Sequence, residues 1–157
     1  MTPPDLPVTL RLSLRAGTVY YFDHRRLSSV EPLFFVVINA DPQSGNVLIM
    51  TVGSSQIVKT QERRKDFPSE TLVIVDPVEY SDFSKQTIVD CNQVFELSKE
   101  ELIQKFNARE LRYHKDLPEK ILKRIWRGVR LSPRVDEIHK NLIPPEDIQN
   151  KLGPPLA

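Results

Sequence analysis

Apolar residues in the first two-thirds of the chain gather in short runs separated by polar turns. The runs occupy residues 17–23, 33–39, 47–52, 71–76 and 86–91. Runs of this length that are rich in β-branched and aromatic residues are typical of strands. The turn ADPQSGN, between the second and third runs, predicts an antiparallel hairpin. Because no helical pattern separates the runs, we expect an antiparallel barrel or sandwich and not a parallel sheet.

The segment between the third and fourth runs lacks such a pattern. Residues 53–70 are polar and charged throughout most of their length. We therefore expect a long loop here, with part of a strand at 56–59.

Helical patterns begin after the last apolar run. Ser98 and Glu101 have the spacing of a capping box, which predicts the start of a short helix. A second helix is expected over 118–129, with proline at its first position. Its apolar residues fall on one face, namely Ile121, Leu122, Ile125 and Val129. With a third helix expected over 133–142, the predicted fold class is α+β, mainly β: a small antiparallel β-barrel followed by short C-terminal helices.

Cysteine content and hydropathy limit the possible classes of protein. The single cysteine, Cys91, excludes an intramolecular disulfide and a metal site of several thiolates, and we expect it to be a buried core residue. No stretch approaches the ~20 apolar residues that a membrane helix needs, and the N-terminus lacks a signal-peptide pattern. We therefore expect a cytoplasmic protein with no membrane association.

Charge is distributed unevenly along the chain. The net charge is +1, but residues 109–140 hold ten Lys and Arg against five Asp and Glu. A basic segment on a slightly acidic body predicts contact with nucleic acid or with an acidic protein partner. The alternative is an ordinary solvated helical face.

Only one group of residues has the composition of a reactive site. The chain has no Gly-rich phosphate loop and no HExxH, CxxC or GxSxG motif. Two polar clusters follow the first and third runs: His24, Arg25 and Arg26, then Ser54, Ser55 and Gln56. In a small barrel, the loop after the first strand can lie near the end of the third. An imidazole that removes a 2′-OH proton and an Arg that offsets phosphate charge would suit RNA cleavage without a metal. The alternative is a basic surface loop beside a Ser-rich turn.

The order of these pieces resembles the MazF/PemK family of type II toxin–antitoxin toxins. The likeness lies in GTVYY, in Pro32 followed by LFFVVIN, in VLIMTVGSSQ and in TIVDCNQVFELSKEEL, and it covers residues 15–106. It implies an SH3-like barrel with a C-terminal helix, usually a homodimer. It also implies cleavage of single-stranded RNA without metal or cofactor, and neutralisation by a small antitoxin protein.

Matching the family pattern residue by residue assigns roles to parts of both clusters. His24 lies in the loop where some members place a catalytic His, and Ser54 falls where members use Thr or Ser near the scissile phosphate. The predicted catalytic set is His24, Arg25 and Ser54, with the hypothesis that a guanidinium of this loop, from Arg25 or Arg26, replaces the family's Arg before the proline. The predicted RNA-binding set is Arg26, Ser55, Gln56 and Asn92. The corresponding division of the chain is an extended arm (1–14), the barrel with its helix (15–106), a basic helical extension (107–143) and a Pro-rich tail (144–157).

Three positions differ from the family pattern. Glu31 and Asp90 stand where Arg is seen in members, and Asn92 stands where an Asp is seen. Replacing Arg by Glu inverts a charge that would stabilise the reacting phosphate. An alternative interpretation is therefore a barrel of the same fold that binds RNA or a protein partner without cutting. A third is an unrelated small β-barrel interaction module.

Overall fold

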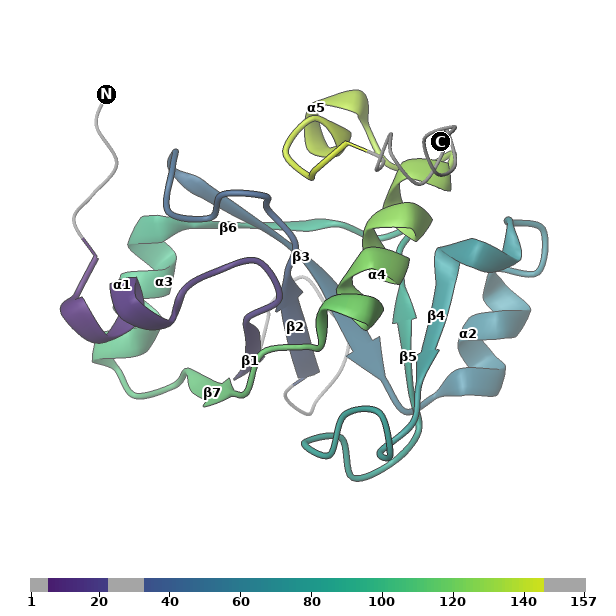
Figure 1. Ribbon diagram of the computed structural model, residues 1–157, viewed down its shortest axis with the longest axis horizontal. Helices are drawn as coiled ribbons and strands as arrows, with labels where there is room; N and C mark the ends of the chain where they lie inside the picture. The colour runs from purple at the N-terminus through teal and green to yellow at the C-terminus, as the bar shows by residue number, and fades with distance from the viewer. Residues whose placement is uncertain (1–5, 23–32, 146–157) are drawn as a thin grey trace, which may run out of the picture.

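The computed structural model describes residues 6–22 and 33–145, which form an α+β fold around one antiparallel sheet (Figure 1). Its strands are β1 (Val19–Phe22), β2 (Leu33–Val37), β3 (Val47–Ser54), β4 (Leu72–Val75), β5 (Thr87–Asp90), β6 (Phe95–Ser98) and β7 (Arg112–His114). The strand order is β4-β5-β3-β2-β1-β7, and β6 pairs separately with β3. The described strands form an open sheet with β4 and β7 at its two edges, so the predicted class is confirmed at the level of a mainly antiparallel α+β fold.

Helices cover both faces of this sheet. They are α1 (Val8–Ser13), α2 (Ile57–Arg63), α3 (Lys99–Asn107), α4 (Glu119–Leu131) and α5 (Glu137–Lys140), with a 3-10 turn at Ser69–Thr71. None of the helices in the described part of the chain combines the length and the apolar composition needed to cross a bilayer.

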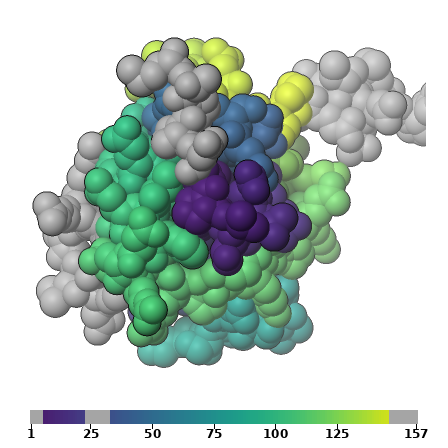
Figure 2. Space-filling model, turned by 90° about the vertical axis from the view of Figure 1, so that its left-hand side faces the viewer, coloured from purple at the N-terminus to yellow at the C-terminus, as the bar shows by residue number. Residues whose placement is uncertain are grey.

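Alternation along the strands sends neighbouring residues into two separate cores. In β1, Val19 belongs to the core under α4, whereas Tyr20 belongs to the core under α1 and α3. The first core includes Val36, Ile38, Ile49, Val73, Val75, Val89, Ile121, Leu122, Ile125 and Val129. The second includes Leu10, Leu14, Phe22, Phe35, Val37, Leu48, Met50, Leu97 and Leu102. Figure 2 shows α1, in purple, directly against the green segment that contains α3.

The strongest sequence patterns are confirmed. Each of the five apolar runs contains a strand, and the predicted hairpin is the β2–β3 pair. The side chain of Ser98 accepts the backbone N–H of Glu101 at 3.1 Å, as a capping residue should. The apolar face of α4 lies in the core, and Trp126 Nε1 donates to the carbonyl of Ile38 at 2.9 Å.

The segment 53–70 differs from the expected loop, because it contains α2. Thr60 is the buried residue of α2, and Arg64, directly after the helix, is buried as well. Neither is apolar, so the sequence shows no hydrophobic stripe. Arg64 is buried because its Nε donates to Asp90 Oδ2 at 2.9 Å, which neutralises the charge inside the protein.

Residues 107–143, the predicted basic helical extension, pack onto the sheet. They provide β7, which pairs with β1, and α4, whose apolar face is needed to complete the first core. The third predicted helix is present but shorter, as α5. The expected extended arm contains the helix α1, with Leu10 buried in the second core. Residues 1–5 and 146–157, and so most of the predicted Pro-rich tail, lie outside the described residues.

Candidate functional site

Three strand ends meet at one end of the sheet, which we call the β1–β2–β3 end. In the β1–β2 pair, Phe22 lies opposite Leu33; in the β2–β3 pair, Phe34 lies opposite Gly53. Ser54 therefore ends β3 beside the first residue of β2. Of the two residues that flank segment 23–32, Leu33 begins β2, the strand paired with β3, and Phe22 ends β1, one strand farther from β3. His24, Arg25, Arg26, Glu31 and Pro32 themselves lie outside the described residues.

The polar cluster that follows β3 is open to solvent. Ser54 is partly exposed and its Oγ accepts the backbone N–H of Gln56 at 3.1 Å. Ser55 and Gln56 are both exposed, and Gln56 makes no side-chain cap for α2. These hydroxyl and amide groups can therefore hydrogen-bond to a ligand at this end of the sheet.

Asn92 does not belong to this cluster. It is buried within what we call the Asp90–Asn92 network: Arg64, Thr71, Asp90, Asn92 and Ser132. Its Nδ2 donates to Thr71 Oγ1 at 2.9 Å and to Asp90 Oδ1 at 3.0 Å, and its Oδ1 accepts from Ser132 Oγ at 2.6 Å. With its side chain enclosed and bonded in this way, Asn92 contributes to the stability of the fold and lies apart from the other predicted RNA-binding residues that the structure describes.

Asp90 has an equally internal role. Its Oδ2 accepts from Arg64 Nε, and its Oδ1 accepts the backbone N–H of Asn92 at 3.0 Å. The exposed Arg63 adds a longer contact, at 3.6 Å from the same Oδ2. A carboxylate is thus needed at this position to neutralise a buried guanidinium.

Cys91 is a core residue, as predicted. The side chain is fully buried, and desolvation raises the pKa of its thiol. A Cβ on Gly128 of α4 would approach Sγ to 2.7 Å, so the thiol packs against the helix backbone. This environment excludes a role for Cys91 as a nucleophile.

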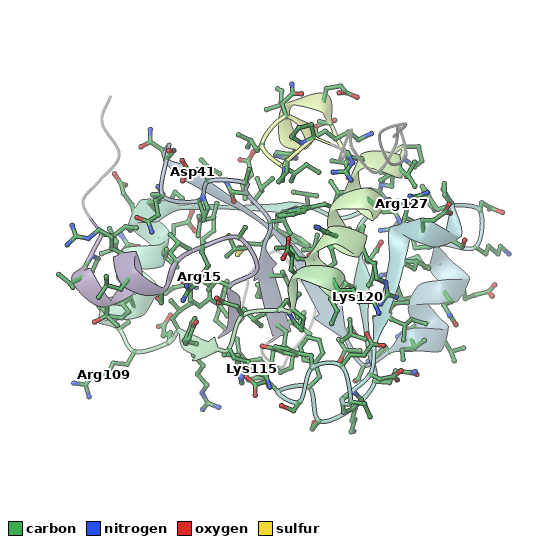
Figure 3. All side chains as sticks on the ribbon, viewed as in Figure 1. Arg15, Asp41, Arg109, Lys115, Lys120 and Arg127 are labelled. Atoms are coloured by element: carbon green, nitrogen blue, oxygen red, sulfur yellow. The ribbon has the colours of Figure 1, made fainter. Side chains whose placement is uncertain are left out.

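A second polar group lies near the β1–β2–β3 end, and the sequence analysis did not find it. His114 Nδ1 of β7 is 3.4 Å from Asp82 Oδ2, and that oxygen also accepts the backbone N–H of Lys115 at 3.0 Å. Figure 3 labels Lys115 beside the loop that joins β4 and β5, which carries Asp82. Asp82 and His114 are 32 residues apart in the sequence, so no local pattern indicates that they meet.

The remaining histidine described, His139, forms a similar pair elsewhere. Its Nε2 is 2.7 Å from Glu96 Oε1, which joins α5 to β6. Across the described ranges, no three His, Cys, Asp or Glu side chains are grouped so that they could hold a metal ion.

The basic residues of α4 lie outside both groups. Lys120, Lys123 and Arg127 are exposed on the side of the helix away from its core face, and Figure 3 labels two of them. Lys123 pairs with Glu119 at 3.4 Å, and Arg124 pairs with Glu79 at the same distance. This is the geometry of a solvated helical face, with some of its charge balanced locally.

Comparison with protein-family models finds no match for this chain, and comparison with curated proteins finds no relative.

Proposed function

We propose that this chain is a MazF/PemK-like endoribonuclease that cleaves single-stranded RNA without a metal ion, at the β1–β2–β3 end. One observation carries the proposal. The strand register brings the residues that flank segment 23–32 to the sheet end where the exposed Ser54–Gln56 cluster lies. A base, a guanidinium and a hydroxyl from these two segments would then meet a single phosphate.

The proposed reaction needs no group beyond these side chains. His24 removes the proton of a 2′-OH, and the resulting oxygen attacks the adjacent phosphorus. Arg25 offsets the negative charge that develops on the phosphate, and Ser54 donates a hydrogen bond to one of its oxygens. The bond from phosphorus to the 5′-oxygen breaks, and this oxygen leaves with a proton from solvent water, so the upstream product ends in a 2′,3′-cyclic phosphate and the downstream product in a 5′-OH.

Two of the three departures from the family pattern have a structural explanation that does not involve catalysis. Asp90 neutralises the buried Arg64, and Asn92 bonds to Thr71 and Ser132. Neither position is therefore evidence that activity has been lost. This favours the nuclease over a barrel that only binds RNA.

Glu31 is the observation that supports the second candidate, a barrel of the same fold that binds RNA or a protein without cutting. A carboxylate close to the substrate phosphate would repel it. The proposal also includes closure into an SH3-like barrel, a homodimer, an antitoxin partner and a cytoplasmic location, each of which follows from the resemblance.

The test is incubation of the purified protein with a long single-stranded RNA in EDTA. We expect cleavage with 2′,3′-cyclic phosphate ends by the wild type. The His24→Ala/Arg25→Ala double variant should lose activity by about 100-fold or more, since one acid–base group alone contributes about that much. Ser54→Ala should retain reduced activity.

His139→Ala is the matched control, because it removes a histidine that pairs with a carboxylate far from this sheet end. It should cut at the wild-type rate. Folded wild-type protein that binds RNA but leaves it uncut would support the binding-only candidate. Cleavage that survives the double variant would place the site elsewhere.

A further inference from the structure

Aromatic rings gather on one face of the sheet beside the β1–β2–β3 end. The ring centroids of Tyr21 and Phe34 are 4.7 Å apart, and the His114 ring lies 5.2 Å from Phe34 and 6.1 Å from Tyr21. Tyr21, Phe34 and His114 are all partly exposed. Partly exposed rings on a strand surface are the platforms on which proteins stack single-stranded bases.

A cation lies over this platform. The guanidinium carbon of the exposed Arg112 is 6.0 Å from the centroid of the Tyr21 ring. The guanidinium makes no ion pair with any carboxylate among the described residues. Arginine binds phosphate through two parallel hydrogen bonds and also stacks on flat rings, so it suits a nucleotide better than a purely apolar ligand.

The imidazole of His114 is oriented and has one nitrogen available. Asp82 faces Nδ1, and the N–H of Lys115 fixes the same Asp82 oxygen. Nε2 has no hydrogen-bond partner among the described residues, and the side chain is 28% exposed. A carboxylate on one ring nitrogen favours a proton there and leaves the other to bond a ligand.

The strand register connects this group to the proposed cleavage site. Gly53, Phe34, Tyr21 and Arg112 are successive partners across β3, β2, β1 and β7. Three interstrand spacings separate Gly53 from Arg112, about 14 Å in all. A strand of RNA at Ser54 that crosses β2 and β1 would therefore reach Arg112 with its neighbouring nucleotides.

We propose that Tyr21, Phe34, Arg112 and the Asp82–His114 pair form a nucleotide-binding subsite, which holds the base and phosphate of an RNA residue next to the scissile one. The aromatic rings stack the base, Arg112 binds the phosphate, and His114 Nε2 bonds the base or ribose. This subsite rests on the proposed function for its position along the RNA, but its binding can be measured without cleavage.

The experiment uses a short, fluorescently labelled 2′-O-methyl oligoribonucleotide, which has no 2′-OH to attack the phosphate. Fluorescence anisotropy gives its affinity for wild type, Arg112→Ala, His114→Ala and the control His139→Ala. We expect Arg112→Ala and His114→Ala to weaken binding about five- to ten-fold, and His139→Ala to bind as wild type. Arg112→Ala should also lower the slope of log affinity against log salt by about 0.7, the value for one phosphate contact on a single strand.

Direct contact has an independent readout in the wild-type protein. The chain has only three histidines, so each imidazole C–H signal can be assigned in NMR spectra from its alanine variant. We expect the His114 signal to shift when the oligonucleotide is added and the His139 signal to stay. With His24→Ala and His139→Ala the His114 signal is also assigned by elimination, so this measurement holds even if His114→Ala proves to be unstable.

The possible results separate the subsite from the nuclease. Unchanged affinity and salt slope in both variants, or an equal loss in His139→Ala, would overturn the subsite even if the wild type cleaves ordinary RNA. Selective loss of binding without any cleavage by the wild type would leave the subsite in place and overturn the nuclease. A wild type that binds no oligonucleotide overturns the subsite, and one that also leaves ordinary RNA uncut overturns both.

Discussion

The Asp90–Asn92 network and the proposed subsite use similar groups in opposite ways. Each contains a carboxylate that faces a basic side chain, but the side chain of Asp90 is 7% exposed and that of Asp82 is 31% exposed. In the network, the Asp90 and Asn92 side chains bond to partners inside the protein. In the subsite, His114 Nε2 and the Arg112 guanidinium face outward. A polar residue at a position that matches a family pattern is therefore informative about function only when its hydrogen-bonding groups are not already satisfied within the protein.

The largest expected effect is in the network. Asp90→Ala leaves the buried guanidinium of Arg64 without its carboxylate, so we expect a loss of about 3–5 kcal/mol in the free energy of unfolding, measured by urea denaturation. Arg63 also contacts Asp90, but its side chain is 52% exposed. Arg63→Ala should therefore lower the free energy of unfolding by less than about 0.5 kcal/mol. Equal effects for the two variants would contradict the buried role of Arg64.

A second effect tests how tightly α4 packs over the network. In Gly128→Ala, the new Cβ would approach both Cys91 Sγ and the carbonyl oxygen of Glu70 to 2.7 Å. Alanine normally stabilises a helix interior by about 1 kcal/mol relative to glycine, but overpacking should reverse the sign to a net loss of about 2 kcal/mol. Thermal unfolding measures it. Adding Cys91→Ala should restore only part of the lost stability, because the Glu70 carbonyl remains in the way. An increase in stability in Gly128→Ala would contradict this, because it would mean that α4 lies farther from Cys91 and Glu70.

Ser132→Ala should have a smaller effect. It removes the hydroxyl that donates to Asn92 Oδ1 and accepts the backbone N–H of Arg134 at 3.1 Å. A buried acceptor left without its partner costs about 1–3 kcal/mol, and we expect about 1.5 kcal/mol from urea denaturation. RNA affinity should be unchanged, since the network is buried. A variant that folds stably but binds RNA less well would contradict this separation.

The smallest stability effects are expected in the subsite. Arg112→Ala and His114→Ala should each change the free energy of unfolding by less than about 0.5 kcal/mol, because their side chains are exposed or partly exposed. The same urea titrations measure this. A loss above 1.5 kcal/mol for His114→Ala, comparable to Ser132→Ala, would make the Asp82–His114 pair a structural element like the network.

Much of the fold could be predicted from the sequence because its main elements carry clear apolar patterns over several residues. The apolar runs specify strands, and Ser98 with the apolar face of α4 specifies helices. Strand β7 has three residues, too few to show a period, and α2 buries Thr60 and precedes the buried Arg64 in place of apolar residues.

The candidate site was harder to predict, for a different reason. Ser54 and its neighbours could be found because they directly follow a clear strand. Asp82 and His114 come together only because β7 pairs with β1, and that contact depends on the tertiary fold. The burial of Asn92 could not be predicted, because a polar residue in a turn gives no sign in the sequence of whether it is buried.

The late position of α4 along the chain has a consequence for synthesis in the cell. Strands β1 to β5 are complete by Asp90, but the helix that covers one face of their sheet spans Glu119–Leu131. A nascent chain of intermediate length therefore presents Val36, Ile49 and Val89 to solvent on an uncovered sheet face. Apolar surface of this kind promotes aggregation and recruits chaperones. Truncation within α4 should consequently give an insoluble product, and not a smaller folded domain.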